Sequence, residues 1–197
     1  MDSGTLRIKM LGSFSLRWKD REILVSARSR KLYLLLAFLI ENRADTVPYS
    51  ALAELLWAGQ SPGAASNALK ALLHRARTML DQLWTGAGRA LIVSRDGGCQ
   101  WSANILLVLD TEEFVRLCQA RKKQQPASTL DALSLYQGDY LPALSDHPWV
   151  KPRSDEFRQL YLHTILTTLP RLNGLGWHQE AAKLTKTALT FEPDCEA

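Results

Sequence analysis

Residues 62–83 read PGAASNALKALLHRARTMLDQL, and this stretch decides the fold. At about 100° per residue, its Ala, Leu and Met side chains fall on one side of a helix. The other side carries polar and basic side chains of the kinds that contact phosphates and base edges. They are Ser66, Asn67, Lys70, His74, Arg75 and Arg77. The pattern predicts an amphipathic helix whose polar face either enters a DNA major groove or is simply solvated.

The segments on either side of this helix favour the first interpretation. Residues 51–57 predict a short helix, and a brief turn connects it to the long one. Residues 91–102 predict a β-hairpin around the turn Asp96-Gly97, with Arg95 beside that turn. This order is typical of a winged helix-turn-helix, with 62–83 as the recognition helix and 91–102 as the wing.

The start of the chain predicts a small antiparallel sheet followed by a helix. Residues 6–11 and 14–18 alternate apolar with polar side chains, and 23–25 form a third β-prone run. Residues 26–31 precede a strong helical pattern that runs through Asn42, and we expect Ser26 or Ser29 to cap the start of that helix. In the same way, Ser50 is expected to cap the short helix.

Basic side chains gather where the first helix begins. Arg28, Arg30 and Lys31 are expected near its first turns, where cations oppose the helix dipole. An approaching phosphate would remove that cost, so Arg28 and Lys31 are candidate DNA contacts. A solvated charged cluster explains the same residues equally well.

The second half of the chain predicts helices only. They are expected over residues 111–123, 127–136, 154–169 and 178–191, with Pro170 kinking or ending the third. The spacing of Ala181, Ala188 and Pro193 after Gly176 is typical of the second half of a tetratricopeptide repeat (TPR). We therefore expect an α+β protein with a winged helix over 1–105 and a TPR-like helical domain over 106–197. A helical stack without a polar cap also predicts that the chain continues past residue 197 or that a partner covers this end.

Charge divides the chain in the same place. Residues 1–109 hold 14 Lys and Arg against 8 Asp and Glu, a balance of +6, whereas residues 110–197 hold 10 against 12, a balance of −2. A basic first half favours a polyanion as its partner. The three cysteines are widely spaced, and no signal peptide or membrane-spanning run is visible, so we expect a cytoplasmic protein without a membrane contact.

A family resemblance rests on several stretches taken in order. LRIKMLGSFSLRWKDREI, SRKLYLLLAFLIEN, SALAELLW, SNALKALLHRARTML and LIVSRDGGCQW resemble an OmpR-type winged helix. DTEEFVRLCQA, ALSLYQGDYLPAL, PW and EAAKLTKTALTFEPD resemble a bacterial transcriptional activation domain (BTAD). The combination resembles the antibiotic-pathway regulators called SARPs, over nearly the whole chain.

The resemblance implies a cytoplasmic bacterial transcription regulator, with an activator as the expected type. It implies binding of double-stranded DNA at direct repeats by tandem protomers, which would make a homodimer on DNA. It also implies that the helical domain contacts RNA polymerase or another protein. The wing departs from the family pattern, because Asp96 stands at its tip and an acid there repels phosphate.

No catalytic constellation is visible, so we expect neither an enzyme nor a cofactor or metal. The sequence leaves one alternative open, namely a protein-interaction module in which the helical domain binds a partner and the winged helix is a docking surface.

Overall fold

The computed structural model describes residues 4–119 and 126–191, which form two compact units. The first unit comprises Met1–Ile8 and Ser15–Val108, and the second comprises Lys9–Phe14 and Leu109–Ala197. The class is α+β, with a small antiparallel sheet at the N-terminus and helices after it, as predicted. No helix in the described ranges is long and apolar enough to cross a membrane.

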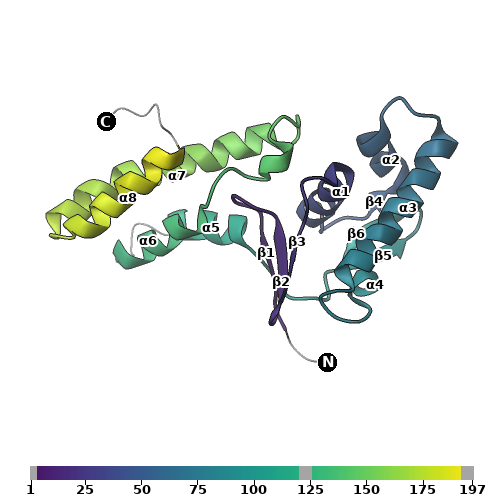
Figure 1. The fold of residues 1–197 in the computed structure, drawn as a ribbon, viewed down its shortest axis with the longest axis horizontal. Coiled ribbons are helices and arrows are strands. Elements are labelled where there is room, and N and C mark those ends of the chain that lie inside the picture. The colour runs from purple at the N-terminus through teal and green to yellow at the C-terminus, as the bar shows by residue number, and fades with distance from the viewer. Residues whose placement is uncertain (1–3, 120–125, 192–197) are drawn as a thin grey trace. The chain divides into compact units, whose positions relative to one another are not determined.

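The described residues of the first unit form two sheets and four helices, and two of the strands end one residue inside the second unit, at Lys9 and Leu109 (Figure 1). Its elements are β1 (Leu6–Lys9), β2 (Ser15–Trp18), β3 (Arg21–Leu24), α1 (Arg30–Glu41), β4 (Val47–Pro48), α2 (Tyr49–Trp57), α3 (Pro62–Leu80), α4 (Ala87–Leu91), β5 (Ile92–Arg95), β6 (Gly98–Trp101) and β7 (Leu107–Leu109). The strand orders are β3-β2-β1-β7 and β4-β6-β5. The strand β7 was not predicted, because three residues are too few to show an alternating pattern.

The apolar sides of the helices meet in one core. Leu35 and Leu36 of α1, Leu52 of α2 and Ala76 and Leu80 of α3 are almost wholly inaccessible to solvent. The helix α3 therefore has a fixed buried face, as its 3.6-residue period predicts. The side that remains outside is the polar one.

Three expectations about helix ends are wrong. Tyr49, rather than Ser50, begins α2, and its N–H donates to the Gly97 carbonyl at 2.9 Å. Ser29 stands at the cap position of α1, but its side chain makes no capping hydrogen bond. The long helix stops at Leu80 instead of 83, because the chain turns there so that Gly88 can pack against it.

The contact at Gly88 determines how α4 follows α3. The Asp81 carboxylate accepts the Gly88 N–H at 2.8 Å. A Cβ on Gly88 would lie 2.2 Å from the Arg77 carbonyl oxygen, which is closer than any real contact. Only glycine therefore allows the two helices to touch here.

The second unit is a set of packed helices with an aromatic core. Its elements are α5 (Asp110–Gln119), α6 (Pro126–Leu135), a 3₁₀ turn (Pro142–Leu144), α7 (Lys151–Gly174) and α8 (His178–Phe191). The predicted end of the first helix, at residue 123, lies outside the described residues. Tyr136 stacks on Tyr161 with ring centroids 4.3 Å apart, and Phe114 and Phe157 complete the cluster. The helix α7 contacts both α5 and α6, and α8 packs on α7.

Pro170 lies inside α7 and does not end it. The helix continues to Gly174, and the Leu175 N–H donates to the carbonyls of Arg171 and Leu172. Leu172 is fully buried. Its burial holds the last turn in place despite the hydrogen bond that a proline cannot make.

The segment Lys9–Phe14 belongs to the second unit through the carboxylate of Asp110. That carboxylate accepts the backbone N–H groups of Met10 and Leu11 at 2.9 Å. Burial raises the pKa of Asp110 to about 6, although these hydrogen bonds and the charge of Lys9 act in the opposite direction.

This raised pKa predicts a pH dependence. The ordinary pKa of an aspartate is 3.8, so between about pH 4 and pH 6 the folded state holds a proton that the unfolded chain has lost. The free energy of unfolding should therefore rise as the pH falls from 7 to 4, by about 1–3 kcal/mol from this group. Urea titrations at several pH values check this. The variant Asp110→Asn should lack this component, and an unchanged pH slope in the variant would contradict the assignment.

Candidate nucleic-acid interface

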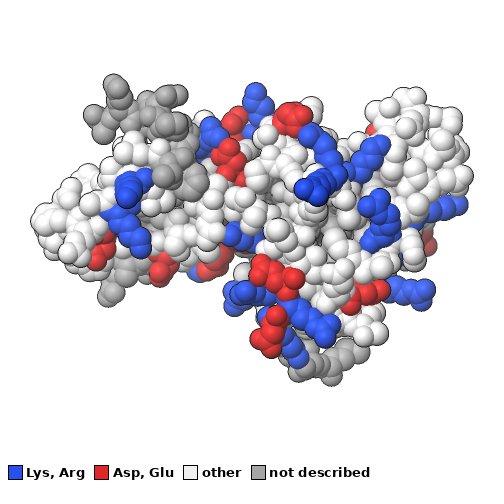
Figure 2. All heavy atoms as spheres, in the orientation of Figure 1, with Lys and Arg blue, Asp and Glu red and all other residues white. Residues whose placement is uncertain are grey.

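The exposed side of α3 carries cations and no acid. The 19 residues of α3 include Lys70, Arg75 and Arg77 and no Asp or Glu. Five of the six predicted contact residues are exposed: Ser66, Asn67, Lys70, His74 and Arg75. We call these five the α3 row. In Figure 2, Lys and Arg side chains gather over α1 and α3.

Arg77, the sixth residue, is not on the free face, which corrects the prediction. It is half-buried, and its guanidinium donates to the Ile92 carbonyl at 3.1 and 3.3 Å and to the Ser94 hydroxyl at 2.8 Å. The guanidinium therefore joins α3 to the first strand of the wing. The sequence placed Arg77 within the polar side of the helix, but helical periodicity cannot show that β5 packs against this position.

Ser94 also receives a hydrogen bond from α2. The Tyr49 hydroxyl donates to the Ser94 oxygen at 3.1 Å. Ser94 lies on β5, and its side chain thus accepts hydrogen bonds from one residue of α2 and one of α3. This cluster of Tyr49, Arg77 and Ser94 fixes where the hairpin β5–β6 lies beside α3.

Replacement of Arg77 should therefore destabilise the winged helix. We expect Arg77→Ala to lower the free energy of unfolding by about 1.5–3 kcal/mol, because a partly buried carbonyl loses its charged donor. Arg75→Ala, two residues away and exposed, should stay within about 0.5 kcal/mol of the parent. Urea unfolding of both variants checks this, and equal effects would show that the Arg77 contacts do not stabilise the fold.

The wing has the predicted hairpin geometry. Strands β5 and β6 pair from Ile92↔Trp101 to Arg95↔Gly98, and Gly97 has a φ of 76° in the turn. Arg95 is exposed beside this turn, as expected. Gly98 lies against β4, where a Cβ would meet the Val47 carbonyl oxygen at 2.4 Å.

Cys99 forms part of the buried side of the wing. Burial raises the pKa of its thiol to about 11, and the positive charge of Arg77 acts in the opposite direction. The thiol is therefore neutral at physiological pH and is a packing group rather than a nucleophile.

The two candidates at the first helix differ. Arg28 is exposed in the turn before α1, and its N–H donates to the Ser26 hydroxyl at 3.3 Å. Lys31 is also exposed, but its ammonium lies 4.5 Å from the centre of the Trp57 ring. This cation–π contact joins α1 to α2. Lys31 therefore has a structural role, whether or not it also contacts a phosphate.

The residues that the structure describes contain no group of three or more His, Cys, Asp or Glu that could hold a metal ion.

The candidate interface consists of the α3 row, Arg95 and Arg28, with Lys31 at its edge. Its chemistry is that of hydrogen-bond donors and positive charge, which suits phosphates and base edges.

Comparisons with known proteins agree with this fold. No protein-family model matches the sequence. The chain is 28% identical over 198 residues to the regulatory protein AfsR of Streptomyces coelicolor, covering 96% of this chain and 19% of AfsR. Its fold is similar to that of Mycobacterium tuberculosis EmbR, solved in complex with a low-affinity phosphopeptide. The TM-score is 0.64 at 19% identity, over 94% of this chain and 55% of that one.

The structure has the order of elements that the sequence predicted, a winged helix followed by a helical unit, and the EmbR structure has a similar fold. AfsR is a regulatory protein. Because the chain spans about a fifth of AfsR and about half of the EmbR chain, what those proteins do as wholes is not transferred here.

Proposed function

We propose that this chain is a sequence-specific DNA-binding transcription regulator of the activator type. In this proposal α3 lies in the major groove, and the wing contacts the backbone beside it. The observation that carries the proposal is the α3 row: five exposed polar or basic side chains on a helix without a single acid. Positive charge that no acid on the helix balances favours a polyanion as the partner.

Roles within the α3 row follow from side-chain chemistry. Asn67 suits a bidentate pair with adenine, and Lys70 and Arg75 suit guanine or phosphate. Ser66 and His74 complete the row as further hydrogen-bonding groups. Arg95 reaches the backbone or a minor groove, and the neighbouring Asp96 keeps the tip of the wing from deep insertion.

The helical unit supplies a protein contact in this proposal. Four large apolar side chains are exposed on α7, α8 and the loop between them: Leu166, Leu175, Trp177 and Leu189. In this proposal they are the candidate contacts for a protein partner. We propose RNA polymerase or a second protomer as that partner, with tandem protomers on direct repeats. We assign no enzymatic activity and no cofactor to the chain.

Selection of bound duplexes from a random library tests the proposal. We expect enrichment of one motif, repeated at a spacing near one helical turn of about 10–10.5 base pairs. The logarithm of the affinity should fall steeply with the logarithm of salt concentration, by about 0.9 for each phosphate neutralised. No enrichment, together with no binding at low salt, would overturn the proposal and favour the protein-interaction module.

A further inference from the structure

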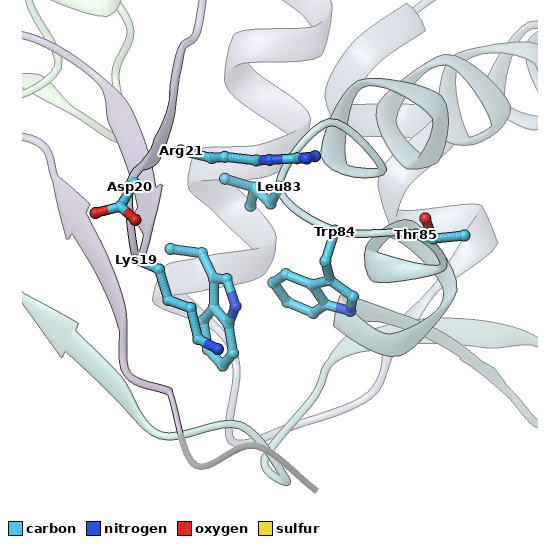
Figure 3. A pocket seen from close by; sticks show the side chains of 7 residues that line it. Lys19, Asp20, Arg21, Leu83, Trp84 and Thr85 are labelled. Carbon is cyan, nitrogen blue, oxygen red and sulfur yellow. The ribbon is translucent and has the colours of Figure 1, made fainter.

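Two adjoining cavities in the first unit share a tryptophan pair in their linings. Trp18, at the end of β2, and Trp84, in the turn after α3, have ring centroids 4.6 Å apart at an interplanar angle of 40°. One cavity has a volume of about 400 Å³ and is lined by Trp18, Lys19, Asp20, Arg21, Leu83, Trp84 and Thr85 (Figure 3). The two rings are only partly buried, so part of each indole remains open to a ligand.

The second cavity is larger and shares the same wall. Its volume is about 860 Å³, within the range of small-molecule sites. Trp18, Lys19 and Trp84 line both cavities. Ile105 and Leu106 add an apolar wall, and Leu106 is 68% exposed. An apolar cavity with a flat indole wall suits a planar aromatic group, which can stack on it.

Charge at the two openings is mostly positive. Lys19 lines both cavities, Arg21 lines the smaller one and Arg89 lines the larger one. Asp20 is the acid among these lining residues, and Figure 3 shows its carboxylate turned away from Trp84. Arg21, which lines only the smaller cavity, donates to the Gln82 carbonyl at 3.2 Å. Lys19 and Arg89 are the cations that line the larger cavity. An anionic group on the ligand would therefore be matched at the cavity mouth.

The backbone at Lys19 is strained. Its φ is 52°, in the left-handed region that side chains other than glycine and asparagine rarely adopt. The two-residue turn between β2 and β3 would cost less with glycine at this position. The hairpin accounts for this φ, because two-residue turns between antiparallel strands place a positive φ at their first residue.

We propose that this tryptophan-walled site binds a small planar aromatic carboxylate. The aromatic ring lies against Trp18 and Trp84 inside the larger cavity, and the carboxylate accepts hydrogen bonds from Lys19 and Arg89. The site uses none of the α3 row, so it stands apart from DNA binding.

Calorimetry with 2-naphthoate on the full chain tests this proposal. We expect saturable binding to one site, with 2-naphthamide bound at least about tenfold more weakly because it lacks the charge. The double variant Lys19→Asn with Arg89→Gln should also weaken naphthoate binding by about tenfold or more. Asparagine tolerates the φ at residue 19, so this variant keeps the fold.

Two further variants separate the site from non-specific binding. Ala90→Phe should fill the cavity without a change of charge and abolish binding, because Ala90 is exposed on α4 and lines the larger cavity. Lys186→Gln, on the exposed side of α8, should bind naphthoate as the parent does. Absence of saturable binding, or equal binding by the parent, Ala90→Phe and the double variant, would overturn the proposal.

Discussion

Joint replacement of Lys70 and Arg75 by alanine should weaken specific DNA binding by about 100-fold or more at 0.1 M salt, because each such contact is worth about 1–3 kcal/mol. Both side chains are exposed on α3, and alanine favours a helix, so the fold should be unaffected. If both cations contact phosphates, the slope of log affinity against log salt should also decrease by about 1.8. Titration of a selected duplex at several salt concentrations measures both quantities.

A matched control separates a local contact from net charge. Lys183 and Lys186 are exposed on α8, and their joint replacement by alanine removes the same two charges from the other unit. This control should bind the duplex within about threefold of the parent if only long-range attraction is lost. Equal losses of DNA affinity in the two double variants would mean that α3 is not the recognition helix.

Gly88→Ala should destabilise the winged helix by about 3 kcal/mol or more, because the added methyl group meets backbone atoms that cannot give way. Its Cβ would lie 2.2 Å from the Arg77 carbonyl oxygen and 2.5 Å from the Arg77 Cα. To relieve this clash, α4 must move off α3 and lose the hydrogen bond to Asp81. Hydrogen exchange of the amides in residues 62–91 should accelerate accordingly.

Gly63→Ala is the control for this change. Gly63 lies in the first turn of α3, and nothing approaches the position of its Cβ within 4 Å. Alanine there should be neutral or should stabilise the helix by up to about 1 kcal/mol. Replacement of glycine by alanine is thus expected to destabilise the protein at residue 88 and to be neutral or stabilising at residue 63. Similar exchange rates in both variants would show that the α3–α4 contact is not close.

Much of the fold could be predicted from local pattern. The 3.6-residue period of 62–83 predicted α3 and its buried side, and the residues of α8 were predicted without error. Asp96-Gly97 predicted the hairpin turn, because only a few residue types suit that backbone. Patterns of this kind depend on neighbours a few residues apart, and a sequence displays those directly.

The candidate site was predicted in part. Five residues of the α3 row and Arg95 are exposed where the pattern placed them. Arg77 was assigned to the same face, yet it binds the Ile92 carbonyl 15 residues further along the chain. The helical period gives the direction of a side chain but not what another segment brings to it. The tryptophan-walled site was missed for the same reason, since Trp18 and Trp84 are 66 residues apart.

The sequence by itself determined the helices other than α4, the polar side of α3 and the turn of the wing, because hydrophobic period and turn chemistry are local properties. The tertiary structure alone decided that Arg77 holds the wing, that Asp110 accepts two N–H groups of the segment Lys9–Phe14, and that α7 continues through Pro170. Each of these depends on burial and on partners distant in the chain. Those partners determine whether a charged or helix-breaking residue is stabilised, and only the folded chain brings them together.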